Sequence, residues 1–260
     1  MSTPTTFRVW ESHLTTYRKI WGSHVLGTVV QPLLYLLGMG LGVGALVDQN
    51  ADALISLDGI SYLAYLAPAL LATSAMMSGG QSSLWEVANG FMWNNRYRAM
   101  AATPLTPGEI AGGLALWHAT RTAIAVVGVA VVLVFFDETR SWGLVPAVPA
   151  AVLTGLAFAM PISAWSATRT TGATFAAVIR FVLIPMFLFG GAFFPVEELP
   201  GWLQPVAYVT PLWHGIELCR GAVISTIDPG PVGLHVAVLV AYAGVGLAAC
   251  RITFARRLKP

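Results

Sequence analysis

Charged side chains are scarce in this chain of 260 residues: they make up only 10% of it, against 56% hydrophobic residues. Soluble domains carry roughly 25% charged residues. So few charges over this length exclude an ordinary soluble domain and predict an all-α protein that crosses a membrane several times. The net charge of +2 excludes nothing, because the information lies in how the charges are distributed.

Several catalytic and binding motifs are also missing. The two lysines, Lys19 and Lys259, follow no glycine-rich loop, which excludes a P-loop nucleotide site. No His/Cys cluster has zinc spacing, and there is no nucleophile elbow. We therefore expect a chain that is not an enzyme and binds no metal or cofactor itself. The only cysteines, Cys219 and Cys250, fall on opposite membrane sides in the topology below, which predicts no disulfide.

The N-terminal segment, residues 4–22, predicts an amphipathic helix lying along the membrane surface. Its apolar and aromatic residues recur with the helical period and form one face: Phe7, Trp10, Leu14, Tyr17 and Trp21. An extension of the first span is the alternative. The charges stop abruptly after Lys19, which favours the interfacial helix. The apolar run that follows is too long for the h-region of a signal peptide.

Uncharged runs then predict six membrane-spanning helices, since about 20 residues suffice to cross. We expect them at about residues 24–47, 60–84, 108–136, 143–167, 174–194 and 230–251. A polar loop, 86–106, separates the second span from the third. Thr106 is placed to cap the third span and Pro107 to begin it. Residues 195–226 combine prolines with aromatic side chains, which predicts short helices lying at one membrane face or dipping into it.

Basic residues gather on one side of this topology. They are Arg8, Arg18, Lys19, Arg96, Arg98, Arg169, Arg251, Arg256, Arg257 and Lys259. The other side holds only Arg140 and Arg220 among many acids: Asp48, Asp52, Asp58, Asp137, Glu138, Glu197, Glu198, Glu217 and Asp228. The positive-inside bias makes the basic side cytoplasmic. Both termini are then cytoplasmic, and residues 195–226 are extracytoplasmic.

Four stretches and the order of the spans resemble the membrane subunit of a type-2 ABC transporter, the permease family that includes lipooligosaccharide exporters and daunorubicin-type drug exporters. The stretches are QPLLYLLGMGLGVG (31–44), ISYLAYLAPALLATSAM (60–76), RYRAMAATPLTPGEI (96–110) and PMFLFGGAFFPVEELPGWLQPVAYVTPLWHGIELCRG (185–221). The resemblance covers nearly the whole chain and is closer to the lipooligosaccharide branch.

This resemblance implies a single transmembrane domain, residues 1–260, in a bacterial cytoplasmic membrane. It implies a second permease copy or homologue and two separate ATPase subunits, which hold ATP and Mg. Residues 4–22 would be the connecting helix, with Trp10, Arg18 and Lys19. The 86–106 loop would couple to the ATPase through Glu86, Asn94, Asn95, Arg96 and Arg98, the alternative being a merely solvated loop. Residues 195–226 would be extracellular re-entrant helices.

Two arginines fall within predicted spans. An isolated charge at the bilayer centre costs at least ~2.5 kcal/mol. Arg121 and Arg180 are therefore expected either to reach the cytoplasmic headgroups or to line a cavity that meets an anionic headgroup. On the extracytoplasmic side, Glu197, Glu198, Trp202 and His214 are candidates for a gate. Hydrated loop acids are the alternative reading for the two glutamates.

These observations favour the permease subunit of an ATP-driven exporter for an amphipathic substrate, such as a glycolipid, a lipooligosaccharide or a hydrophobic drug. A membrane scaffold without transport and a proton-coupled carrier remain alternatives. Secondary transporters usually show internal repeats and ionisable groups near the midplane, and neither is evident here. We expect membrane lipids as partners and no nucleic acid.

Overall fold

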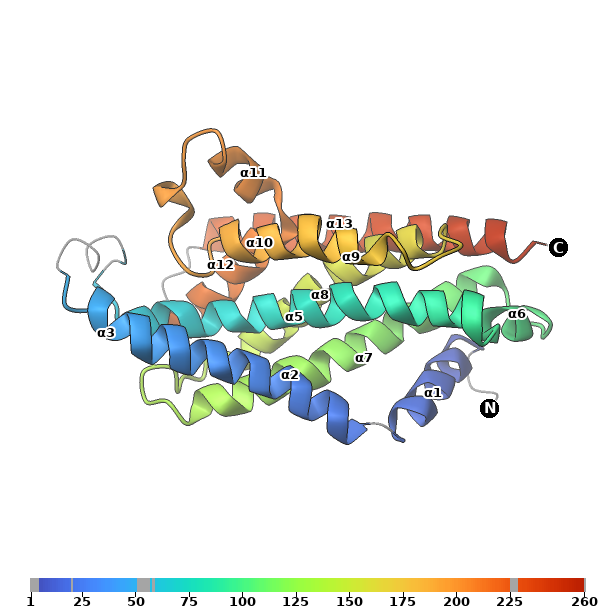
Figure 1. Ribbon diagram of the computed structural model, residues 1–260, viewed down its shortest axis with the longest axis horizontal. Helices are drawn as coiled ribbons and strands as arrows, with labels where there is room; N and C mark the ends of the chain where they lie inside the picture. The colour runs from blue at the N-terminus through green and yellow to red at the C-terminus, as the bar shows by residue number, and fades with distance from the viewer. Residues whose placement is uncertain (1–4, 20, 51–56, 58, 225–228, 260) are drawn as a thin grey trace.

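Helix α5 (Tyr62–Ala88) runs through the middle of the molecule and continues as the π-helical turn η2 (Asn89–Trp93) (Figure 1). The computed structural model describes residues 5–19, 21–50, 57, 59–224 and 229–259. Among them every regular element is helical. Most of the apolar α5–η2 surface is covered by other helices, 78% of its most apolar window being buried, so α5 forms the core of the fold.

The other long helices are α2 (Trp21–Tyr35), continued by η1 (Leu36–Val43) and α3 (Gly44–Val47), then α7 (Pro107–Val134), α8 (Leu144–Ser166) and α13 (Pro229–Arg257). Of these, α2, α7 and α8 pack against α5, and α13 packs on α8 and α7. Five helical segments in the described part are long and apolar enough to cross a membrane: Val30–Val47, Tyr62–Trp93, Pro107–Val134, Leu144–Ser166 and Val232–Arg257. The all-helical, multi-span class is therefore confirmed.

The predicted fifth span, 174–194, is helical over a shorter stretch. It consists of α9 (Phe175–Val178), η3 (Ile179–Leu183) and α10 (Ile184–Phe189). This run falls short of the about 20 residues that a membrane crossing usually needs. The helix ends at Gly190, and Gly191 follows with a φ of 86°, a left-handed backbone that glycine adopts at little cost.

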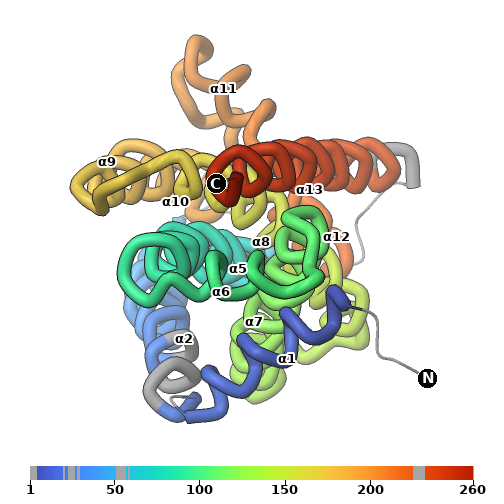
Figure 2. The backbone as a smooth tube through the Cα atoms, turned by 90° about the vertical axis from the view of Figure 1, so that its right-hand side faces the viewer, coloured from blue at the N-terminus to red at the C-terminus, as the bar shows by residue number. Residues whose placement is uncertain are grey.

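The short helices divide between the two ends of the bundle. Figure 1 places α1 (Thr5–Tyr17), α6 (Arg96–Ala101) and the C-terminus at one end. Helices α3 and α12 (Pro211–Ile224) lie toward the opposite end. In both views α11 (Gln204–Val209), which follows η4 (Val196–Glu198), stands away from the bundle (Figures 1 and 2). Helices α1 and α6 and the C-terminus, whose segments carry many of the basic residues, thus share one end of the bundle.

The predicted 86–106 loop is largely helical. The helix beyond Glu86 continues to Trp93 because its apolar residues find partners: Val87 and Phe91 are buried, and the Phe91 ring packs on Phe254 with centroids 4.8 Å apart. Only Asn94 and Asn95 separate η2 from α6. At the end of this segment the predicted cap is confirmed, since the Thr106 hydroxyl accepts from the Glu109 N–H and Pro107 begins α7.

The face that α1 packs against the bundle overlaps the predicted apolar face only in part. Val9, His13 and Tyr17 are buried, whereas Phe7 is 51% exposed and Trp21 already belongs to α2. Val9 packs where α7 carries a glycine: a Cβ added at Gly113 would lie 2.5 Å from the Val9 Cβ. This close approach fixes the rotation of α1, because only that face can reach the α7 backbone. Residues 4 and 20 of the predicted helix lie outside the described residues.

Helices α5 and α8 also cross at close range. A Cβ added at Gly79 would lie 2.4 Å from the carbonyl oxygen of Gly155. Since real Cβ atoms do not come so near a carbonyl, two small residues are required for the two backbones to meet here. Gly79 lies near the middle of the α5–η2 segment, so this crossing holds the central helix against α8 about halfway along its length.

Candidate functional site

Arg96, at the start of α6, joins that helix to α1. Its Nη2 donates to the Thr16 hydroxyl at 2.5 Å and to the Ser12 carbonyl at 3.4 Å, and its Nη1 lies 3.1 Å from His13 Nδ1. The Asn94 side chain accepts from the Arg96 N–H at 3.0 Å, and Asn95 has a left-handed backbone with φ 53°. The predicted coupling segment and connecting helix are therefore in direct contact.

A buried ion pair lies directly behind Arg96. Glu86 belongs to α5 rather than to a loop, and its side chain is only 16% exposed. One carboxylate oxygen is 2.7 Å from His13 Nδ1, and the other is 3.7 Å from Arg121 Nη1 on α7. Buried charges need such partners, because an unpaired one is costly. Glu86 thus links α1, α5 and α7.

His13 Nδ1 cannot satisfy both of its neighbours at once. It donates to Glu86 if it carries a proton, and it accepts from Arg96 if it does not. The ring also stacks on Trp117, with centroids 5.8 Å apart. The sequence interpretation did not single out His13 as a site residue, although it lies three residues after Trp10 and one turn before Tyr17, on the side of α1 that packs against the bundle.

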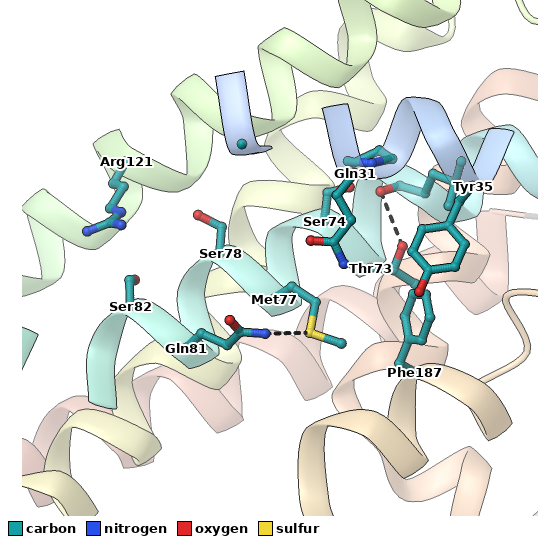
Figure 3. A pocket seen from close by; sticks show the side chains of 13 residues that line it. Gln31, Tyr35, Thr73, Ser74, Met77, Ser78, Gln81, Ser82, Arg121 and Phe187 are labelled. Atoms are coloured by element: carbon teal, nitrogen blue, oxygen red, sulfur yellow. Dashed lines mark hydrogen bonds between the residues drawn. The ribbon is translucent and has the colours of Figure 1, made fainter. Parts of the chain in front are cut away.

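Two adjoining cavities lead from this junction into the bundle. The first, about 380 Å³, is lined by His13, Glu86 and Arg96 among others. The second, about 260 Å³, lies between α2, α5 and α10 and reaches Gln31, Tyr35 and Phe187 (Figure 3). Both are lined by Gln81, Ser82 and Arg121. The two cavities therefore adjoin one another at these residues, and we call them together the polar path.

The polar path follows a row of small polar side chains on α5. Figure 3 shows them beneath α2 and α7: Thr73, Ser74, Ser78, Gln81 and Ser82. Their spacing of three or four residues puts them on one side of the helix. Hydroxyl and amide groups both donate and accept, so this surface can hydrogen-bond a neutral polar ligand. Arg121 is the charged side chain that lines both cavities.

The remaining predicted residues at this end do not line the polar path. Arg98 is exposed on α6, and Arg18 and Lys19 are exposed just after α1. Trp10 is turned toward α7, where its Nε1–H donates to the Thr120 hydroxyl at 2.9 Å. Arg180, on η3, is exposed and lines neither cavity.

The predicted gate residues are dispersed at the opposite end. Glu197 accepts from the Tyr208 hydroxyl at 2.9 Å, and Trp202 is 76% exposed. Glu198 is exposed and lines the same hollow of about 550 Å³ as Glu197. His214 is buried, with its Nδ1 2.7 Å from that of His235 on α13. At that separation one nitrogen donates and the other accepts, so the two rings cannot both be charged.

Arg220, which was not among the predicted site residues, connects three segments at this end. Its guanidinium lies 3.8 Å from the centre of the Tyr65 ring on α5 and donates to the Gly191 carbonyl at 2.8 Å. It also pairs with Glu217 at 2.7 Å. Burial raises the pKa of Glu217 and outweighs the opposing effect of Arg220. The available signal in the sequence was that Arg220 is one of two basic residues on the acidic side and lies one helical turn after Glu217.

The comparisons with known proteins agree with this architecture. A family model described as ABC-2 type transporter matches residues 6–224. Nodulation protein J of Rhizobium meliloti (strain 1021) is 32% identical over 97% of this chain and 93% of its own length. Nodulation protein J of Rhizobium leguminosarum bv. trifolii is 33% identical over 82% and 78%. The inner membrane transport permease YadH of Escherichia coli (strain K12) is 23% identical over 85% and 83%. Given these matches, the chain belongs to the ABC-2 type transporter family, as a membrane permease component.

Proposed function

We propose that this chain is the permease subunit of an ATP-driven exporter that moves an amphipathic molecule outward from the cytoplasm or the inner leaflet. The observation that carries the proposal is the polar path, which begins at the contact of α1 with α6 and enters the bundle between α2 and α5. A lipid-facing helix surface has no need of this row of hydroxyl and amide groups. Membership of the ABC-2 family favours ATP over a proton gradient as the energy source.

The proposed topology has six crossings, with α9, η3 and α10 together as the fifth. The end that carries α1, α6 and the C-terminus is cytoplasmic, which the basic residues gathered there support. The segment from η4 to α12 then forms the extracytoplasmic re-entrant helices, and Glu197, Glu198, Trp202 and His214 belong to the gate region.

A second permease copy is part of the proposal. The side of α2 and η1 next to the polar path exposes large apolar residues to the outside of this chain, including Leu34 at 63% and Leu41 at 49%. Only 22% of the Val30–Val47 window is buried within one chain. A partner packed here would close the open side of the polar path.

Two ATPase subunits, which bind ATP and Mg, would dock beneath α1 and α6. Nodulation protein J, by name, belongs to a nodulation system, and this similarity favours a lipooligosaccharide-like substrate here. The polar part of such a substrate would follow the hydroxyl and amide row on α5, near Arg121.

Capture of the ATPase subunit by the tagged permease tests this function. Arg98 is the better position to substitute, because the Arg96 side chain also hydrogen-bonds α1 and replacing Arg96 would disturb the fold. We expect Arg98→Glu to reduce capture at least about tenfold, since it places like charges at the contact. Arg140→Glu, the same change at the opposite end, is the matched control. Unchanged capture with Arg98→Glu and Arg96→Glu alike would remove the coupling assignment.

A further inference from the structure

Residues of α8 and α13 line a long apolar groove. Helix α13 lies on the side of the bundle away from α1 and α2 (Figure 2). The groove consists of two adjoining hollows. One of about 570 Å³ lies beside α11, and one of about 600 Å³ extends toward Thr168 and Thr253. Both are lined by Pro161 and Tyr242, so they form one groove. No residue of the polar path lines it.

On both walls of the groove the lining residues are followed in sequence by an arginine. On α13 the lining residues Tyr242, Gly246, Ala249 and Thr253 recur at steps of four and three residues, and Arg256 is the next residue on that stripe. Pro161 and Ala164 of α8 and Thr168, in the turn after α8, line the other wall, and Arg169 is the residue after Thr168.

The two arginines lie at the same end of the groove. Arg257 donates to the Ala167 carbonyl at 2.5 Å, which holds the last turn of α13 beside the end of α8. Arg256 directly precedes Arg257, and Arg169 lies two residues after Ala167. Arg169 lies with its guanidinium 4.6 Å from the centre of the Trp165 ring, a residue that lines the groove.

No carboxylate neutralises these charges from within the two helices. The sequence contains no Asp or Glu between Glu138 and Glu197, and none after Asp228. Arg169 Nε is buried without a hydrogen-bond partner among the described residues. Among the described residues, the site thus combines an apolar groove with two arginines that lie near one end and have no carboxylate on either helix, which is complementary to an amphiphile that has a single anionic end.

We propose that this groove binds an anionic phospholipid of the cytoplasmic leaflet, with an acyl chain along α8 and α13 and the phosphate between Arg169 and Arg256. Basic pockets between transmembrane helices on the cytoplasmic side are suited to such headgroups. The lipid is distinct from the transported substrate, because the groove and the polar path share no lining residue. The leaflet follows from the orientation given under the proposed function, whereas the site itself does not depend on transport.

Lipid retention by the purified protein is the direct test. The protein is extracted in detergent, exchanged into mixed micelles containing phosphatidylglycerol, and analysed by native mass spectrometry. We expect one tightly retained phosphatidylglycerol per chain. Arg169→Gln with Arg256→Gln should weaken retention about thirtyfold, from about 1 kcal/mol for each arginine near the headgroup. Arg251→Gln with Lys259→Gln, which removes the same charge from exposed positions at the same end, should retain the lipid.

A second variant tests the acyl-chain site without changing charge. Ala249→Trp fills the groove and should also abolish retention, while phosphatidylcholine should be retained no better by wild type than by the double arginine variant. Equal phosphatidylglycerol retention in all variants would overturn the proposal. If the double arginine variant retained the lipid but lost capture of the ATPase subunit, that result would contradict the lipid site and assign these arginines to the ATPase contact. A phospholipid site would also be contradicted if free phosphate or a fatty acid displaced the bound lipid as well as added phosphatidylglycerol does.

Discussion

At the scale of single residues, the central feature is the shared nitrogen of His13. Its Nδ1 lies 2.7 Å from Glu86 and 3.1 Å from Arg96, and one tautomer can serve only one of them. Arg96 belongs to the helix at the proposed ATPase contact, and Glu86 is next to Arg121 in the polar path. A displacement of Arg96 would therefore leave His13 Nδ1 to Glu86 alone, and would change how closely Glu86 pairs with Arg121 beside the path.

His13→Ala should destabilise the protein by about 2 kcal/mol, because it removes a hydrogen bond to a largely buried carboxylate. The midpoint of thermal unfolding in detergent measures the effect. Thr15→Ala, at an exposed position of the same helix, is the control and should change little. Adding Glu86→Gln to His13→Ala should recover part of the loss, since a neutral amide needs no compensating charge. A double variant less stable than His13→Ala alone would contradict this account.

At the scale of the elements, small residues decide how the helices meet. The rotation of α1 depends on Gly113, where α7 leaves room for Val9 and for the Thr6 carbonyl. Sequence periodicity alone favoured the face of Phe7 and Trp10, because it measures hydrophobicity and not the shape of the opposite surface. The exposed Phe7 side remains available to a membrane surface, as an interfacial helix requires.

Gly113→Ala should displace α1 and cost about 1–3 kcal/mol, as overpacking usually does. Gly108→Ala is the matched change on the same helix, where an added Cβ meets only a Thr106 Oγ1 at 4.0 Å. It should be neutral or slightly stabilising, because alanine is the better helix former. Hydrogen exchange of the α1 amides reports the displacement directly. Equal exchange in both variants would show that α1 does not depend on this contact.

At the scale of the whole molecule, the distribution of charge predicts the sidedness. Arg98 and Trp202 are exposed at opposite ends of the bundle, and the native cysteines Cys219 and Cys250 are buried. In intact cells a membrane-impermeant maleimide should label Trp202→Cys and leave Arg98→Cys unmodified until the cells are opened. The unsubstituted protein gives the background. The reverse pattern would invert the proposed topology.

Much of the fold could be predicted from the sequence, and the site only in part. Uncharged runs predict most of the long helices because membrane burial acts on each helix separately. The sequence predicted Glu86 in a loop because its neighbours are polar. The helix continues past Glu86 because Val87 and Phe91 join a buried cluster with Phe254, which lies near the far end of the chain. The contacts of His13 with Glu86 and of Arg220 with Tyr65 join residues distant in sequence, which no local pattern reveals.

The close crossing of α5 and α8 at Gly79 gives the central helix a point about which it can tilt. Its 32 residues, Tyr62–Trp93, span about 48 Å, and Gly79 lies near their midpoint. The C-terminal half of this segment ends at the two-residue link to α6. The N-terminal half carries Tyr65, whose ring contacts the Arg220 guanidinium. A tilt of about 5° would move each end by about 2 Å. That displacement is enough to break the 3.3 Å hydrogen bond from the Tyr65 hydroxyl to the Gly191 carbonyl and to separate the Tyr65 ring from Arg220. We therefore expect a displacement of α6 to loosen the contacts at the opposite end of the molecule.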